Sequence, residues 1–287
     1  WHSHHDTLSM NLFAYGKPLL EEFNRFGSYG NPLDMVGRAP SSHNQVLIDE
    51  FFYDNRGKPI RDLAWHSDDE VDYFSAYHRA YRWLPNVDGC GYIMSMDAIV
   101  RRTIVFVKRR GYVLVLDSVR DELSDHFNRA VTSHWHSPFG FEAIDRQTAR
   151  TKGKPGCMVR FAHAEGLKAF LIEPDYAGAD AATQEPLKER WHLRARRWFA
   201  EGTAIHAPGF ATLLYPFEDR QPRVDVVPMD LPGSVMFRAE GFEVRTPAGV
   251  DRILLDPERL GGMRYRGKAF DARAVVKLDG RRGAITI

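Results

Sequence analysis

Three histidines and a carboxylate stand within five residues near the start of the chain, namely His2, His4, His5 and Asp6. Side chains two positions apart on a strand point to the same face, so His2 and His4 can converge on one site while His5 points away. Imidazole groups serve in proton transfer and in metal binding. A tag remnant is the alternative, but the irregular order and the direct passage into residues 7–16 argue against it.

Possible partners for these histidines follow within the next forty residues. The carboxylates Glu21 and Glu22 end an apolar run, and His43 comes directly before a predicted strand. Neutral imidazole and carboxylate are donors that suit zinc, and ligands from separate strands would hold the sheet edges together. His4, Glu22 and His43 form such a set. Their spacing is too wide for a local finger motif, and the alternative for His43 is a satisfied polar residue at a sheet end.

The elements that must position these side chains are strands, because the dominant hydrophobic period is two. Residues 99–107 and 112–117 are rich in β-branched residues and flank a short turn that contains Gly111, which predicts a hairpin. Similar runs follow the same pattern at 45–49, 157–163, 168–172, 210–215, 224–227, 234–244, 250–255 and 274–277. Many strands at short spacing predict an all-β fold, a large antiparallel sandwich with little helix. Residues 187–200 fit a helical period weakly, although Trp191, His192 and Leu193 are typical of a strand.

Composition narrows the class of protein further. The 287 residues contain 39 Lys plus Arg and 38 Asp plus Glu, a net charge of +1, which gives no general attraction to nucleic acid. No apolar stretch reaches the 18 or more residues of a membrane-spanning helix. Cys90 and Cys157 lack metal or redox spacing. We find no composition shift that proves a boundary, so one domain over residues 1–287 is predicted.

Three ordered motifs within the first fifty residues resemble a known family. They are the His-Ser-His-His-Asp segment at 2–6 with Thr7-Leu8-Ser9, the Tyr-Gly-Lys-Pro-Leu-Leu segment at 15–20, and the Ser-His-Asn-Gln-Val-Leu-Ile-Asp segment at 42–49. Together they resemble the C-terminal β-sandwich region of heparinase II/III-like polysaccharide lyases, whose fold is a supersandwich. The resemblance continues more loosely to the end of the chain.

The resemblance implies roles for individual residues. It implies His4 and His43 as ligands of a mainly structural zinc, with the acidic ligand at Glu22. This chain has Glu-Phe-Asn at 22–24 where the family usually has Asp, so Glu21 remains a register alternative.

The same matching places His2 at the cleft as a catalytic histidine, and Tyr29 where some alginate-acting members bind substrate. We therefore predict His2 and Tyr29 as catalytic residues, with packing as the alternative for Tyr29. Arg25 and Arg38 are predicted contacts for a substrate carboxylate or sulfate, because guanidinium offers a bidentate fork.

The function that the resemblance implies is β-elimination in a polysaccharide that contains uronic acid, such as heparan sulfate or alginate. Such a reaction needs a neutralised carboxylate, a base, and a proton for the departing oxygen. In the family an N-terminal helical toroid supplies much of this machinery. We expect that toroid to be missing from this chain, the isolated chain to be nearly inactive, and the whole protein to be periplasmic or secreted.

Two other classes of protein compete with the lyase. The first is a non-catalytic carbohydrate-binding or scaffold module with the same sandwich. The second takes His2 and His4 as the metal-binding pair of an amidohydrolase-like hydrolase, but that fold needs a βα barrel, which the strand-rich pattern argues against.

Overall fold

The computed structural model describes residues 4–22, 37–49, 59–79, 97–122, 130–172, 192–197 and 208–287. Its strands are β1 (Leu12–Ala14), β2 (Lys17–Leu20), β3 (Val46–Ile48), β4 (Arg61–Ser67), β5 (Val71–His78), β6 (Ala98–Val107), β7 (Tyr112–Asp121), β8 (Val131–His136), β9 (Phe141–Ala143), β10 (Thr148–Thr151), β11 (Gly156–Phe161), β12 (Leu167–Ile172), β13 (His192–Arg197), β14 (Gly209–Phe217), β15 (Asp225–Met229), β16 (Glu240–Thr246), β17 (Gly249–Leu255), β18 (Arg264–Tyr265), β19 (Lys268–Ala269), β20 (Ala274–Lys277) and β21 (Ile285–Thr286). A short 3₁₀ helix, η1, covers Pro40–Ser42. The prediction of an all-β fold is confirmed.

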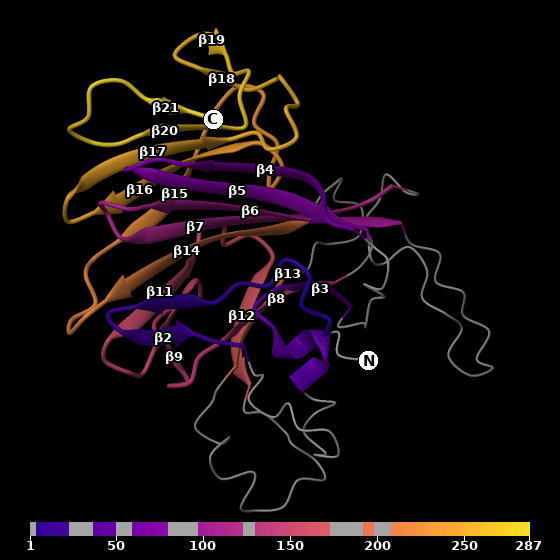
Figure 1. Ribbon diagram of the computed structural model, residues 1–287, viewed down its shortest axis with the longest axis vertical. Helices are drawn as coiled ribbons and strands as arrows, with labels where there is room; N and C mark the ends of the chain where they lie inside the picture. The colour runs from indigo at the N-terminus through magenta and orange to yellow at the C-terminus, as the bar shows by residue number, and fades with distance from the viewer. Residues whose placement is uncertain are drawn as a thin grey trace, which may run out of the picture.

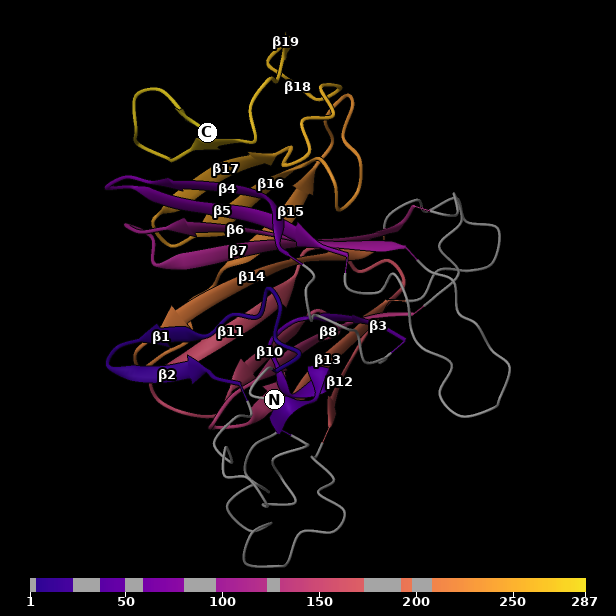
Figure 2. The ribbon, with the colours of Figure 1, turned by 45° about the vertical axis from the view of Figure 1, so that its right-hand side comes forward.

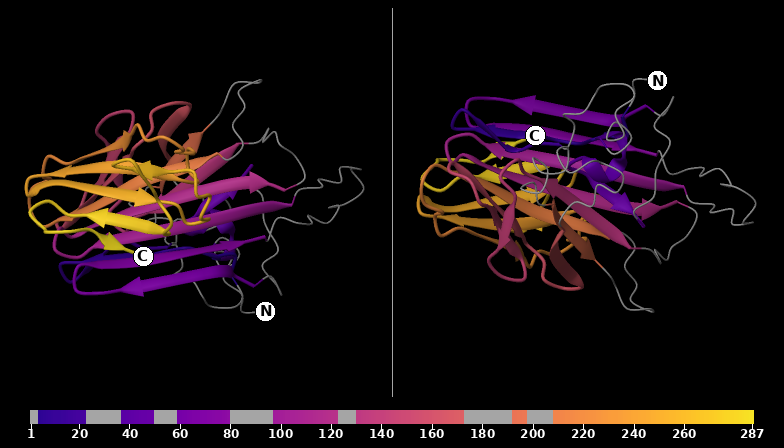
Figure 3. Two further views of the ribbon diagram at one scale, coloured as in Figure 1. Left: turned by 90° about the horizontal axis from the view of Figure 1, so that it is seen from above. Right: turned by 90° about the horizontal axis from the view of Figure 1, so that it is seen from below.

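The strands form three stacked layers of antiparallel sheet (Figures 1 and 2). The central sheet has eight strands in the order β4-β5-β6-β7-β14-β11-β10-β9. The five-stranded sheet β15-β16-β17-β20-β21 covers one of its faces, with strands running in roughly the same direction (Figure 3). The hairpin β1-β2 and the four-stranded sheet β12-β13-β8-β3 cover the other face. The arrangement is a large antiparallel sandwich, as predicted.

The predicted hairpin at the centre of the large sheet is confirmed. β6 and β7 pair from Ala98 with Asp121 to Val107 with Tyr112, in one unbroken register. Gly111 has φ +68° in the connecting turn, a left-handed conformation that glycine adopts without strain. Because side chains alternate along a strand, this hairpin contributes to the cores on both faces of the sheet.

Two expectations about secondary structure are corrected. The weak helical period over 187–200 is wrong where the chain is described, because β13 occupies His192–Arg197 between β8 and β12. Pairing on both sides satisfies the backbone of this segment and overrides its helical pattern. The run predicted at 234–244 begins instead as a turn, in which Phe237 is buried with φ +61°, and the strand starts at Glu240.

Candidate functional site

The structure brings the three predicted metal ligands together. His43 follows η1 directly, precedes β3, and is completely buried. Its Nδ1 atom lies 3.0 Å from Oε2 of Glu22, whose side chain is 13% exposed two positions past the end of β2. The ring of His4 lies with its centroid 5.7 Å from that of His43. Residues from the chain start, the end of β2 and the beginning of β3 therefore meet at one point.

Local contacts keep the Glu22 carboxyl ionised. The Ser9 hydroxyl donates a hydrogen bond to Oε1, and Oδ1 of Asn11 accepts the Glu22 backbone N–H at 3.0 Å. Burial raises the pKa of Glu22, but the hydrogen bonds from His43 and Ser9, together with the electrostatic interactions with His43 and His4, outweigh burial and lower that pKa. Ser9 belongs to the first motif, but no role was predicted for it.

The donor chemistry of this cluster fits zinc. Two imidazoles and a carboxylate are typical zinc donors, and Nε2 of His43 is buried without a hydrogen-bond partner among the described residues. In the described ranges, no three His, Cys, Asp or Glu side chains are arranged to hold a metal ion as they stand, and Glu22 contacts His43 directly. The carboxylate that reaches His43 belongs to Glu22, which favours Glu22 over Glu21 as the acidic residue of the site. The metal itself stays a prediction.

Asn44 connects the chain start to β8 beside the cluster. It is fully buried, and its Nδ2 donates to the carbonyl oxygen of Met10 at 2.9 Å. Its Oδ1 accepts the His136 backbone N–H at 2.7 Å and lies 3.0 Å from Nδ1 of that ring, while the other ring nitrogen lies 2.9 Å from the Ser41 carbonyl oxygen. These long-range contacts fix the backbone on both sides of His43. These hydrogen bonds give His136 a structural role.

A buried ion pair of the central sheet also holds the backbone next to His43 and that of the chain start. Arg102 on β6 donates to Asp117 on β7 through two hydrogen bonds, at 2.7 and 3.0 Å, and both side chains are at most 2% exposed. Its Nη1 atom donates to the carbonyl oxygens of Leu8 at 2.9 Å and Asn44 at 2.6 Å. The guanidinium lies over the ring of Trp135. One arginine thus joins the sheet to the segments that carry His4 and His43.

Sequence reasoning missed this support, although a signal was present. Arg102 and Asp117 are charged residues inside two apolar runs, and a hairpin with its turn at 108–111 places them opposite each other. Gln45 is a second missed support, because its Nε2 donates to the carbonyl oxygens of His5 and Pro40, both at 2.7 Å. The partners of Gln45 lie up to forty positions away, so no local pattern indicates them.

Of the other four predicted site residues, the structure describes only Arg38. His2, Arg25 and Tyr29 lie outside the described residues. Arg38 is described, and its backbone carbonyl oxygen accepts a hydrogen bond from the His5 N–H at 3.3 Å, which places it beside the chain start.

Within the described part of the chain, no helix has the length and apolar character needed to cross a membrane.

The fold is similar to the β-sandwich of solved heparinase-type lyases. No protein-family model matches the chain, and no curated protein matches its sequence. Among solved structures, heparan sulfate lyase HepC from Pedobacter heparinus matches with a TM-score of 0.62 at 13% identity, over 89% of this chain and 37% of that one.

Two heparinase III structures agree. The BT4657 gene product matches with a TM-score of 0.62 at 16% identity, over 88% of this chain and 36% of that one. A further heparinase III structure matches with a TM-score of 0.63 at 12% identity, with the same coverage. At these identities the likeness shows the fold, and the resemblance inferred from the three motifs is confirmed at that level. The chain spans little more than a third of the length of the structures it matches.

Proposed function

We propose that this chain is the β-sandwich part of a polysaccharide lyase that cleaves an acidic, uronic-acid-containing polysaccharide by β-elimination. The observation that carries the proposal is the meeting of His4, Glu22 and His43, one from each of the three motifs or their flanks, on a fold shared with heparan sulfate lyases. Heparan sulfate and alginate are the substrate types considered. The likeness in fold favours the first.

In this proposal the chain supplies one wall of the catalytic cleft. His2 and Tyr29 act on the substrate, as proton donor or acceptor, and Arg25 and Arg38 bind its carboxylate or sulfate groups. His2 lies two positions before His4 in the sequence, so the contacts that hold His4 also limit where His2 can lie. The buried Arg102–Asp117 pair therefore has a catalytic consequence in this proposal, because it orders this side of the cleft before substrate binds.

Zinc is proposed as the resident metal, held by His4, Glu22 and His43. When bound, it would supply a fixed positive charge that joins three chain segments. Glu22 is suited to this role because its carboxylate, which is anionic at neutral pH, lies 3.0 Å from Nδ1 of His43. Asn11 and Ser9 orient its carboxylate and backbone, in the manner of residues that support metal ligands from outside. The role is structural in the first place, since the same cluster links the hairpin β1-β2 to β3.

The partner of this wall is proposed to be an N-terminal helical domain of the same protein. The matched lyases are more than twice as long as this chain, so further catalytic groups have room outside the matched part. The chain alone is then expected to show little lyase activity. An extracellular polysaccharide substrate also favours a periplasmic or secreted location.

The proposal is tested by assaying the complete protein against heparan sulfate, alginate and other uronate polysaccharides. β-Elimination leaves an unsaturated uronate, so we expect an increase in ultraviolet absorbance with at least one polymer. A His2→Ala variant should lose this signal, while the matched variant His66→Ala, at a half-exposed position on β4, should keep it. No signal with any polymer, combined with measurable binding, would favour the non-catalytic carbohydrate-binding module instead.

A further inference from the structure

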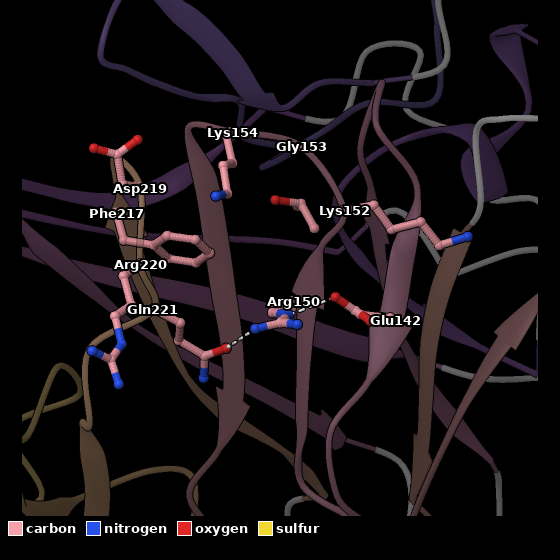
Figure 4. A pocket seen from close by; sticks show the side chains of 10 residues that line it. Glu142, Arg150, Lys152, Gly153, Lys154, Phe217, Asp219, Arg220 and Gln221 are labelled. Atoms are coloured by element: carbon pink, nitrogen blue, oxygen red, sulfur yellow. Dashed lines mark hydrogen bonds and ion pairs between the residues drawn. The ribbon is translucent and has the colours of Figure 1, made fainter.

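A second feature of the molecule lies away from the histidine cluster, in a pocket of about 280 Å³ (Figure 4). It lies between the loop that follows β10 and the segment that follows β14. Its lining residues are Glu142, Arg150, Thr151, Lys152, Gly153, Lys154, Phe217, Asp219, Arg220 and Gln221. Four of these are basic and two are acidic, so the pocket carries a positive charge although the whole chain is nearly neutral.

The basic residues of the pocket differ in how they are partnered. Arg150 is held in place, with Nε donating to Glu142 at 2.6 Å and Nη1 to Gln221 at 3.4 Å. The side chains of Lys154 and Arg220 make no ion pair or hydrogen bond with any residue that the structure describes, and both are exposed. Figure 4 shows the Lys154 ammonium group pointing toward Phe217 on the pocket side, while Lys152 extends away. Two cations therefore border the pocket without a counter-charge from a salt bridge.

The backbone around the pocket is packed closely against aromatic side chains. A Cβ atom added to Gly153 would lie 2.5 Å from the ring of Phe139, and one added to Gly156 would lie 2.5 Å from the ring of Phe217. The loop that carries Lys154 thus rests directly on two aromatic rings. Its carbonyl oxygen at Lys154 also accepts a hydrogen bond from Lys17 at 3.3 Å. A preformed concave site loses less conformational entropy when it binds a ligand.

We propose that this pocket is an accessory binding site for an anionic sugar unit, recognised by its sulfate or carboxylate group. Uncompensated positive charge in a concave site attracts anions, and lysine and arginine are the residues that bind sulfate and carboxylate oxygens. The volume is just below the range of typical small-molecule pockets, which suits one charged sugar unit. That the sugar belongs to a polysaccharide rests on the proposed function, whereas the binding of the anion does not.

The loop that borders the pocket and the histidine cluster lie near opposite ends of β2. Lys17, whose ammonium group contacts the pocket loop, begins β2, and Glu22 lies just past the end of this strand. Five residues of extended chain cover about 16 Å. The pocket therefore engages a polysaccharide several sugar units away from the cleavage point, and favours long chains over short ones.

The binding test uses the complete protein and three probes: a heparan sulfate tetrasaccharide, free glucuronate and inorganic sulfate. The double variant Lys154→Gln/Arg220→Gln removes the two unpartnered cations. The matched control Lys268→Gln/Arg282→Gln removes two exposed cations elsewhere, so the net charge is the same. By calorimetry at low salt, we expect about tenfold weaker tetrasaccharide binding for the first variant, the loss of roughly one charge-assisted hydrogen bond. The control should bind like the unchanged protein.

A third variant guards against a folding defect. Asp219→Asn removes an unpartnered carboxylate from the rim, so it should strengthen tetrasaccharide binding. Binding of sulfate but not glucuronate would assign the site to sulfated sugars, and the reverse to uronates. The proposal is overturned if the unchanged protein binds no probe, if Lys154→Gln/Arg220→Gln binds as tightly as the control, or if Asp219→Asn weakens binding.

Failure of this proposal can be told apart from failure of the proposed function. If unsaturated product forms but the pocket variants bind normally, the accessory site is wrong and the lyase stands. If no product forms but binding depends on Lys154 and Arg220, the accessory site stands without the lyase. If both stand, the double variant should raise KM for long polymers and leave kcat on short oligosaccharides unchanged.

Discussion

The two faces of the eight-stranded sheet handle polar residues differently. On the face toward β1-β2, Arg102 and Asp117 are buried deep in the layer and bond to backbone that carries the histidine cluster. On the face toward the five-stranded sheet, buried charged residues such as Asp251 and Arg101 bond instead to side chains of other strands, Tyr112 and Asp62 respectively. There they join strands that the apolar core already holds together. The buried charges on the first face fix the backbone that carries the histidine cluster. Those on the second face join one strand to another.

This difference indicates which face is functional. A buried ion pair is often no more stabilising than a well-packed apolar pair, because both charges lose their hydration. Arg102 therefore contributes something other than net stability. It donates to two carbonyl oxygens in segments that sheet pairing does not reach, and these segments carry His4 and His43. We interpret the pair as a positioning device for the site.

The largest expected effect comes from breaking this device. Arg102→Met leaves Asp117 buried without its partner, so we expect a loss of about 3–5 kcal/mol in the free energy of unfolding, measured by urea denaturation. Arg245→Met, which breaks the exposed pair with Glu243, should lower the free energy of unfolding by less than about 1 kcal/mol.

The double variant Arg102→Met/Asp117→Leu separates the effect of the pair on stability from its effect on position. Two apolar side chains can replace a buried pair at little cost, so most of the stability should return. Amide hydrogen exchange around Leu8 and Asn44 should nevertheless stay faster than in the unchanged protein, because their carbonyl oxygens lack the arginine donor. Normal exchange there would show that the pair has no positioning role.

A smaller effect is expected from crowding the backbone behind Asp117. A Cβ atom at Gly209 would lie 2.0 Å from the Asp117 carbonyl oxygen, which is backbone and cannot move aside easily. Gly209→Ala should therefore destabilise the protein by up to about 3 kcal/mol. In the five-stranded sheet, a Cβ atom at Gly241 would lie nearest to the end of the flexible Leu231 side chain, which can move aside. Gly241→Ala should therefore destabilise the protein less. Equal shifts in thermal midpoint for the two variants would contradict this reasoning.

The pH dependence of stability should also reflect the site-facing side of the sheet. Burial, with a further contribution from the positive Arg102, lowers the pKa of His78 from 6.5 to about 3. The folded protein keeps His78 neutral while the unfolded chain takes up a proton, so stability is complete above pH 6.5 and is lost as the pH falls toward 3. At pH 5 the loss should be about 2 kcal/mol. In a His78→Gln variant, denaturation curves between pH 7 and 5 should lose this part of the slope, and an unchanged slope would assign the effect to other groups.

Local sequence patterns predict the parts of the fold that depend on neighbouring residues, but not the parts that depend on long-range pairing. The β6-β7 hairpin follows from alternation and a turn glycine, both of which are local. The strand His192–Arg197 was not predicted, because its pairing with β8 and β12 is long-range and outweighs its local helical period.

In the site, His43 and Glu22 could be found from residue type and motif order. The motif residues Ser9 and Asn44 received no role, because the side chains that they contact lie far along the sequence. The undescribed His2 and Tyr29 stay predictions.

The metal site is tested most directly by the zinc content of the purified protein and of its Glu22→Gln variant, with the exposed Glu165→Gln as matched control. Elemental analysis should find about one zinc per chain in the unchanged protein and the control, and much less in Glu22→Gln. A chelator should lower the thermal midpoint of the first two more than that of the third. Unchanged protein that is purified with zinc available, carries none, and keeps its midpoint with chelator would contradict the assignment of His4, Glu22 and His43 as a metal centre.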